Sequence, residues 1–228
     1  MRPIIKKENV KPLLETRFLN VYDLQYEEGK HYFDASRKPL EQLTAIKSDE
    51  EFLNATPDAV TCVVVLKVSD LTSTNSTSDH GAEPLLLLTK EYRYPTGQFL
   101  LSPPAGLLDA EDLSCAEPLL SAARREILEE TGISLKESDT LKVINPLLFS
   151  TPGMTDESNG LALAVVSLDN LDDLTQEGAV GSECFDGFCL LTKAQALDIL
   201  KNGRDADGRF YSVYTWAALM YFVTDMWQ

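Results

Sequence analysis

The sequence predicts a mixed α/β sandwich rather than a doubly wound parallel sheet. Apolar runs of strand length recur along the chain, and amphipathic stretches of helical length lie among them. The two kinds of segment do not alternate in a regular βαβ order, and the chain contains no internal repeat. Its 228 residues, 44% of them hydrophobic, suffice for one core of moderate size with a small appendage.

A first unit is expected over residues 1–57. Residues 18–26 and 31–37 are rich in β-branched and aromatic side chains, and the turn-forming sequence EEGK lies between them. These segments predict a hairpin or small sheet, followed by an irregular or briefly helical connection over residues 39–57. Because two strands are only marginally stable alone, this unit should pack against another surface.

A second unit is expected over residues 58–228. Residues 59–68 form a nearly continuous apolar run, which is typical of a buried central strand. Pro146 interrupts the strand expected at residues 141–150, so this strand should lie at an edge or contain a bulge. The remaining strands are expected at residues 85–94, 98–101, 160–168 and 184–191.

Helices are expected at residues 118–131, 193–202 and 212–226 of this second unit. The aromatic side chains of the last helix, Trp216 among them, should pack in the core. Residues 69–84 are polar and rich in Ser and Thr, which predicts a surface loop. His80 in this loop has no second His or Cys nearby, so a metal role is disfavoured.

Composition narrows the classes of function. The formal net charge of −16 repels a nucleic acid backbone, so DNA and RNA binding are disfavoured. No apolar run is long enough to span a bilayer, and the N-terminal residues lack a signal-peptide core. The four cysteines show no metal-binding spacing, which favours reduced thiols. Together these features predict a soluble cytoplasmic protein that binds neither nucleic acid nor membrane.

The most informative segment is the acidic end of the helix expected at residues 118–131. Glu126, Glu129 and Glu130 are three or four residues apart, so their carboxylates should project from one helix face. A solvated acidic surface is the simplest interpretation. A divalent cation is the alternative, because hard cations take oxygen ligands and often share them with substrate phosphates.

The sequence REILEETGI, with Glu117 upstream, resembles the Nudix box of the Nudix hydrolase family, G-x5-E-x7-R-E-U-x-E-E-x-G-U, in which U is aliphatic. The box glycine would fall at position 111, which is Glu111. Gly106 is the expected equivalent, with five extra residues before the helix. Ser114 offers an alternative, in which it caps a helix one turn longer.

The resemblance implies a Nudix-type α/β/α sandwich with a small N-terminal β appendage. It also implies a magnesium site, with manganese as the alternative metal. The ligands would be Glu126, Glu130 and Glu129, together with the backbone carbonyl of Ala105. Arg125 and Glu117 would form an ion pair that holds the preceding loop against the helix and orients the ligands.

Two further segments resemble the ADP-ribose pyrophosphatase branch of this family. The sequences KEYRYP and PAG are similar to the E-Q-Y-R and L-E-x-P-A-G segments of that branch, which implies that Arg93 contacts substrate phosphates. An ion pair at the end of a strand is an equal alternative for Arg93. Ser102 stands where the branch has Glu. The sequence TPGMTDE resembles the S-P-G-x-T-x-E loop, which makes Glu157 the general base or, alternatively, a solvated loop acid.

These resemblances imply a magnesium-dependent pyrophosphohydrolase that cleaves ADP-ribose or a nucleoside diphosphate sugar into a nucleoside monophosphate and a sugar phosphate. Oxidised nucleoside triphosphates, dinucleoside polyphosphates and coenzyme A are alternative substrates, and a non-catalytic nucleotide sensor is the alternative outside enzymes. In the branch, the N-terminal segment packs against a partner subunit. A homodimer is therefore expected through residues 1–57.

Overall fold

A computed structural model describes residues 3–69, 83–181 and 183–228, which form two compact units. The first unit contains Met1–Asp58 and Leu147–Asn159, and the second contains Ala59–Pro146 and Gly160–Gln228. The sequence placed one boundary after residue 57. The structure additionally assigns the segment around the loop at residues 150–157 to the first unit.

The first unit is built on an antiparallel sheet in the order β1-β2-β3. Its strands are β1 (Val10–Glu15), β2 (Asn20–Glu27) and β3 (Lys30–Ser36). The small sheet predicted here is confirmed, but strand β1 was not predicted. This strand contains Pro12, and all of its residues except Val10 are exposed. The core of this unit is formed by Val10, Tyr22, Leu24 and Leu43.

Short helical turns follow the sheet over the segment that was expected to be irregular or briefly helical. Ser48 begins α1 with a capping box, in which its hydroxyl accepts a hydrogen bond from the backbone N–H of Glu51. The helical segments of this unit are η1 (Lys7–Asn9), η2 (Leu40–Gln42), η3 (Thr44–Ile46) and α1 (Asp49–Leu53).

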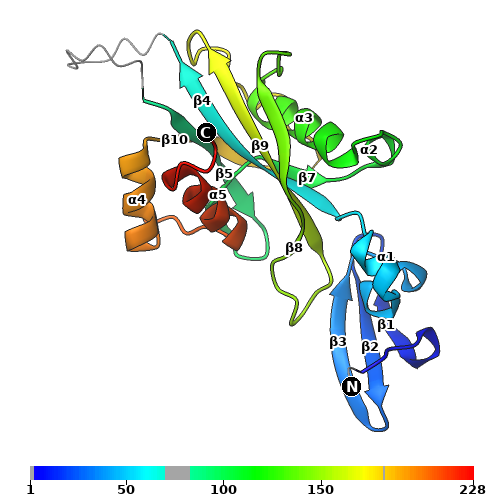
Figure 1. Ribbon diagram of the computed structural model, residues 1–228. Coiled ribbons are helices and arrows are strands. Elements are labelled where there is room, and N and C mark those ends of the chain that lie inside the picture. The colour runs from blue at the N-terminus through cyan, green and yellow to red at the C-terminus, as the bar shows by residue number, and fades with distance from the viewer. Residues whose placement is uncertain (1–2, 70–82, 182) are drawn as a thin grey trace. The chain divides into compact units, whose positions relative to one another are not determined.

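The second unit is built on a seven-stranded sheet, with the order β10-β5-β4-β9-β8 (Figure 1). The short strands β6 and β7 pair with β5 and β4, and the strand predicted around Pro146 is an edge strand, as expected. The strands are β4 (Ala59–Val68), β5 (Leu85–Arg93), β6 (Gln98–Ser102), β7 (Ala105–Leu107), β8 (Thr140–Phe149), β9 (Ser158–Leu168) and β10 (Phe185–Leu191).

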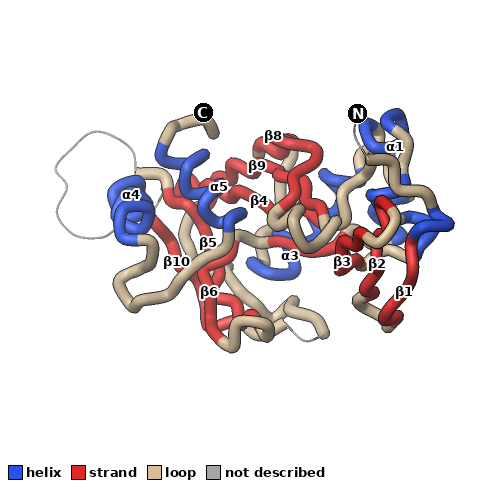
Figure 2. The backbone as a smooth tube through the Cα atoms, turned by 90° about the horizontal axis from the view of Figure 1, so that it is seen from below, coloured by secondary structure: helices blue, strands red, loops and turns tan. Residues whose placement is uncertain are grey.

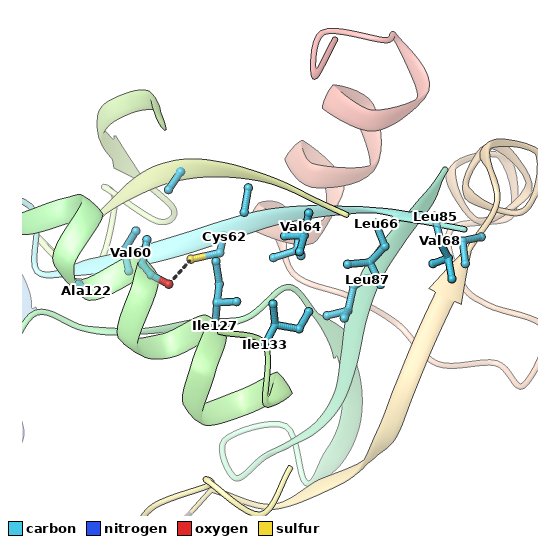
Figure 3. Close-up of a cluster of buried hydrophobic side chains, with 14 residues drawn as sticks. Val60, Cys62, Val64, Leu66, Val68, Leu85, Leu87, Ala122, Ile127 and Ile133 are labelled. Atoms are coloured by element: carbon cyan, nitrogen blue, oxygen red, sulfur yellow. Dashed lines mark hydrogen bonds between the residues drawn. The ribbon is translucent and has the colours of Figure 1, made fainter. Parts of the chain in front are cut away.

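Helices cover both faces of this sheet, which confirms the α/β/α sandwich (Figure 2). Alternate residues of β4 face opposite layers: Cys62 and Val64 pack in the same core cluster as α3, whereas Val63 and Val65 pack with α4 and α5. Figure 3 shows the first of these clusters. The helices are α2 (Ala110–Leu113), α3 (Pro118–Thr131), α4 (Lys193–Asn202) and α5 (Val213–Val223).

The last helix corrects one expectation about packing. Leu219 and Phe222 are buried, as expected for a helix that covers the sheet. Trp216, on the same helix, has 48% of its surface exposed, so its predicted place in the core is wrong.

Most of the loop expected at residues 69–84, including His80, lies outside the described residues. Within the described ranges, the protein contains no helix that combines the length and the apolar character needed to cross a membrane.

Candidate active site

The acidic helix α3 is fixed at both ends and along its inner face. Pro118 occupies the first turn, and Gly132 ends the helix in the left-handed conformation, with its N–H donating to the carbonyl of Leu128. Ala122 and Ile127 are fully buried in the cluster that contains β4 (Figure 3). This packing fixes the rotation of the helix and so determines where its carboxylates project.

Glu126 and Glu130 lie one turn apart, and both are buried, with only 4% and 2% of their surfaces exposed. Glu129 is more open, with 30% of its side chain exposed. The three carboxylates therefore do not form the evenly solvated acidic surface that was the simplest interpretation of the sequence. Burying two carboxylates on one helix is costly unless positive charge or hydrogen bonds compensate.

Glu130 is only partly compensated. Its Oε1 accepts a hydrogen bond from the N–H of Ala105 at 3.2 Å, while its buried Oε2 has no hydrogen-bond partner. Burial, reinforced by the charges of Glu91 and Glu126, raises the pKa of Glu130 to about 9. This carboxylate thus lies in a place that lacks positive charge.

Glu126 lies against Gly106, the middle residue of β7. A Cβ atom built on Gly106 would lie 1.9 Å from Oε1 of Glu126, so any larger residue here would force the Glu126 carboxylate to move. Burial raises the pKa of Glu126 to about 7, although the Arg125 guanidinium opposes this shift. The close approach supports the assignment of Gly106 as the glycine equivalent to that of the box.

Arg125 joins the helix to the preceding segment. Its Nη1 donates to Oε1 of Glu126 at 2.6 Å and to Oε2 of Glu129 at 3.2 Å. Its Nη2 donates to Oδ2 of Asp112 at 2.8 Å and to the carbonyl of Leu107 at 2.9 Å. One guanidinium thereby orients two of the candidate ligands and holds the loop against the helix.

The predicted ion pair between Arg125 and Glu117 is wrong. Glu117 is the residue that precedes α3, and among the described residues no ion pair connects it to Arg125. Asp112 takes that role instead and is 2% exposed. Burial alone would raise the pKa of Asp112, but hydrogen bonds from Arg125, Ser121 and the N–H of Asp109 lower it below its ordinary value.

Asp112 could have been found from spacing. It follows Gly106 by the x5 interval that the box sets between its glycine and its first glutamate. The five extra residues therefore lie between Asp112 and Arg125, after the short helix α2. The alternative in which Ser114 caps a longer helix is also wrong, because Ser114 ends α2 and α3 begins at Pro118.

Arg93 lies at the end of β5, where its Nη2 contacts Oε2 of Glu91 at 2.5 Å. Glu91 is also hydrogen-bonded to Ser102, and burial raises its pKa. Glu91 of β5 therefore places a carboxylate beside Ser102, the position at which the branch has Glu. The contact of Arg93 with substrate phosphates stays a prediction.

Glu157 belongs to the first unit. Its carboxylate accepts a hydrogen bond from Nε of Arg37, and its N–H donates to Oγ1 of Thr155 at 3.1 Å. Its side chain is 35% exposed. Glu157 is therefore a held and accessible carboxylate, and its role as a general base stays a prediction.

The donor set on α3 fits a hard cation. Within the described parts of the chain, no three His, Cys, Asp or Glu residues converge closely enough to form a ready-made metal cluster. Even so, Glu130 has a buried unpartnered oxygen, and both buried carboxylates have raised pKa values that bound positive charge would reverse. Ala105 is hydrogen-bonded to Glu130 and is therefore adjacent to the carboxylates, as a ligand carbonyl would need to be.

Comparisons with known proteins agree with this geometry. Residues 74–212, more than half of the chain, match the family model of the NUDIX domain. The ADP-ribose pyrophosphatase of Saccharomyces cerevisiae is 27% identical over 166 residues, which cover 73% of this chain and 59% of that protein. Nudix hydrolase 2 of Caenorhabditis elegans is 40% identical over 84 residues, which cover 37% of this chain and 33% of that protein.

The chain thus spans between about a third and three fifths of the length of these two relatives. A crystal structure of an ADP compounds hydrolase superposes with a TM-score of 0.50 at 19% identity. The superposition covers 100% of this chain and 94% of that one, and at this identity it supports the fold alone.

The role of Asp112 predicts a difference between two acidic residues. Asp112→Asn should lower the free energy of unfolding by about 2 kcal/mol, because Arg125 loses its buried charged acceptor. Glu117→Gln should change it by less than about 0.5 kcal/mol, as expected for a surface substitution. Urea unfolding followed by circular dichroism measures both. Equal losses in the two variants would contradict the assignment of Asp112.

Proposed function

Because this chain belongs to the Nudix hydrolase family, we propose that it is a divalent-metal-dependent hydrolase that cleaves the diphosphate of ADP-ribose or of a nucleoside diphosphate sugar. The products are a nucleoside monophosphate and a sugar phosphate. The resemblance of the segments around Arg93 and Glu157 to the ADP-ribose pyrophosphatase branch supports this substrate class. The similarity to the yeast ADP-ribose pyrophosphatase supports it as well.

The observation that carries the proposal is the buried, unpartnered Oε2 of Glu130 beside buried Glu126. In the proposal, Glu126 and Glu130 hold magnesium, or alternatively manganese, with Glu129 and the carbonyl of Ala105 as further ligands. When bound, this metal neutralises charge on the diphosphate oxygens. A cation at this place also supplies the positive charge that the two buried carboxylates lack.

Other residues of the chain position these ligands. Arg125 fixes the carboxylates of Glu126 and Glu129, and Asp112 fixes Arg125 in turn. In the proposal, Arg93 exchanges its contact with Glu91 for a phosphate of the substrate, because a planar guanidinium can bind phosphate with two N–H groups.

Glu157 is the proposed general base. It accepts the proton of the attacking water, which becomes nucleophilic as the proton leaves. The hydrogen bond from Arg37 holds the carboxylate in one orientation, and the exposure of its side chain leaves it accessible. In the proposal, the general base is a different residue from the carboxylates of α3, which coordinate the metal.

The first prediction of this proposal concerns substrate and metal. With Mg²⁺, the protein should hydrolyse ADP-ribose or nucleoside diphosphate sugars, measured as phosphate released by a coupled phosphatase. The panel also contains a dinucleoside polyphosphate, coenzyme A and nucleoside triphosphates. Glu130→Gln should lower the rate roughly 100-fold or more, because removing one metal ligand removes several kcal/mol of charge stabilisation. Glu137→Gln, at an exposed glutamate, is the matched control.

Other results of this assay would change the proposed substrate or the proposed class of function. Hydrolysis of a different panel member, lost in Glu130→Gln, would keep the metal-dependent chemistry and reject the substrate class. Absence of turnover with every member, together with calorimetric binding of ADP-ribose, would instead favour a nucleotide sensor. Thermal melting with and without Mg²⁺ separates these cases further, since a metal that binds the folded state raises the melting temperature.

Glu157 gives a second prediction. Glu157→Gln should lower kcat about 100-fold, the ordinary contribution of a general base. The increase in melting temperature caused by Mg²⁺ should be unchanged, because the substitution leaves the carboxylates of α3 intact. Glu28→Gln, which removes an exposed carboxylate from the same unit, is the control. A kcat near that of the wild type would remove Glu157 from the mechanism.

We also propose that the protein is a homodimer formed through its first unit. Apolar side chains are exposed on this unit, including Leu13, Leu14, Phe18 and Phe33, whose exposed fractions are 50%, 50%, 69% and 59%. Such exposure is characteristic of surfaces that pack against a partner.

Light scattering after size-exclusion chromatography tests the dimer. The wild type should have twice the chain mass of 25.3 kDa. Phe33→Glu should shift the protein to monomer, because it places a charge within the apolar surface. Phe210→Glu, at a residue of the second unit with 61% exposure, should not. A monomeric wild type at micromolar concentration would refute the proposal.

A further inference from the structure

The first unit contains a cavity of about 360 Å³ that the proposed hydrolysis does not involve. Its walls are largely apolar, with Leu24, Phe52, Phe149 and Met154 among the lining residues. Two acidic residues, Asp34 and Asp156, also line it. A cavity that combines aromatic walls with convergent charged groups has the composition of a small-molecule binding site.

The two carboxylates in this cavity are buried and incompletely paired. Asp34 has 6% of its surface exposed and Asp156 has 9%. Oδ2 of Asp34 and Oδ1 of Asp156 have no hydrogen-bond partner, although Oδ2 of Asp156 accepts the N–H of Thr44 at 3.0 Å. Buried acceptors are nearly always paired in folded proteins, so these two oxygens indicate a missing donor.

The local charge balance indicates that the donor is a cation. Lys38 is the neighbouring ammonium, and it is shared between Asp58, at 2.7 Å, and Asp156, at 3.5 Å. One positive charge therefore faces three carboxylates. Burial, followed by the charge of Asp156, raises the pKa of Asp34 to about 6, which agrees with an excess of negative charge at this place.

The aromatic walls favour an organic cation over a bare metal ion. The rings of Phe52 and Phe149 are nearly parallel, with 6.1 Å between their centroids and 5° between their planes. Ring faces attract cations and pack against flat apolar groups.

We propose that this cavity binds a small organic cation, an ammonium or amidinium group attached to a flat apolar body. The charged group lies between Asp34 and Asp156 and donates to their unpartnered oxygens. The apolar body packs against Phe52 and Phe149. The residues that line this site include none of the carboxylates of α3, and its occupancy requires neither hydrolysis nor a bound metal.

Benzylammonium is the probe, and benzyl alcohol is its neutral match in size and shape. Both are titrated into the 228-residue protein at pH 7.5 and followed by ligand-observed NMR. Benzylammonium should bind with a Kd on the order of 1 mM, as expected for eight non-hydrogen atoms. Benzyl alcohol should bind at least about tenfold more weakly, because it carries no charge to pair with the carboxylates.

Asp34→Asn and Asp156→Asn should each weaken benzylammonium binding at least about tenfold, the loss expected when one partner of a charged pair is neutralised. Glu28→Gln removes the same charge from the same unit at an exposed turn and should leave the Kd unchanged. Thermal melting checks that each variant folds. Two separate Asp variants are used so that poor folding of one does not decide the result.

Four outcomes would overturn the proposal. If benzyl alcohol binds with the same Kd as benzylammonium, the cavity recognises apolar surface and not positive charge. Unchanged affinity in both Asp variants, or no binding of benzylammonium up to 20 times the expected Kd, would reject the site. Adenosine binding that is lost in Asp34→Asn, without benzylammonium binding, would show that the cavity recognises neutral N–H donors. Because the measurement is binding alone, its failure leaves the proposed hydrolysis untouched.

Discussion

Burial of the Glu126 and Glu130 carboxylates is the constraint on which the candidate active site depends. Ionised carboxylates are rarely buried without compensation, and here the compensation is incomplete. The helix cannot rotate to expose them, because Ala123 and Ile127 pack in the core on its inner face. The structure therefore exchanges electrostatic stability for a fixed position of two oxygen-donor groups, which is the arrangement that a hard cation requires.

This constraint explains several features that lie outside the helix. Gly106 leaves room for the Glu126 carboxylate, which any side chain at this position would displace. Arg125 is required because it is the cation that contacts Glu126 directly, and it needs an acceptor on its other edge. Asp112 is that acceptor, and Asp109 fixes it by capping α2 with hydrogen bonds to the backbone N–H groups of Glu111 and Asp112. The short helix α2 thus supports the guanidinium.

The sequence predicted those parts of the structure whose signals are local. The bounds of α3 follow from Pro118, Gly132 and the spacing of its apolar residues, and β4 follows from a continuous apolar run. Asp112 was not predicted as the partner of Arg125 because the motif has Glu at this position. Glu117 also matched the motif's spacing to Arg125, so it was assigned the role instead. Strand β1 was missed because its side chains are mostly exposed and one is proline. Glu126 and Glu130 contact Gly106 and Ala105 of β7. The periodicity of the helix sequence cannot predict that this strand packs against the two carboxylates.

The N-terminal segment is more than the appendage that the sequence indicated. The loop at residues 150–157 belongs to the same compact unit, although about ninety residues separate it from Asp58. The N–H of Ala35 donates to the carbonyl of Met154 at 2.9 Å, and Asp58 accepts both the N–H and the hydroxyl of Ser158 at 2.8 Å.

Arg37 also pairs with Glu157 in this unit. A loop held only at its two ends would sample many conformations, whereas these contacts from β3 and Asp58 restrict it. The first unit therefore determines the conformation of the segment that carries the proposed general base. The N-terminal segment can therefore contribute to function even though it is far from the acidic helix in the sequence.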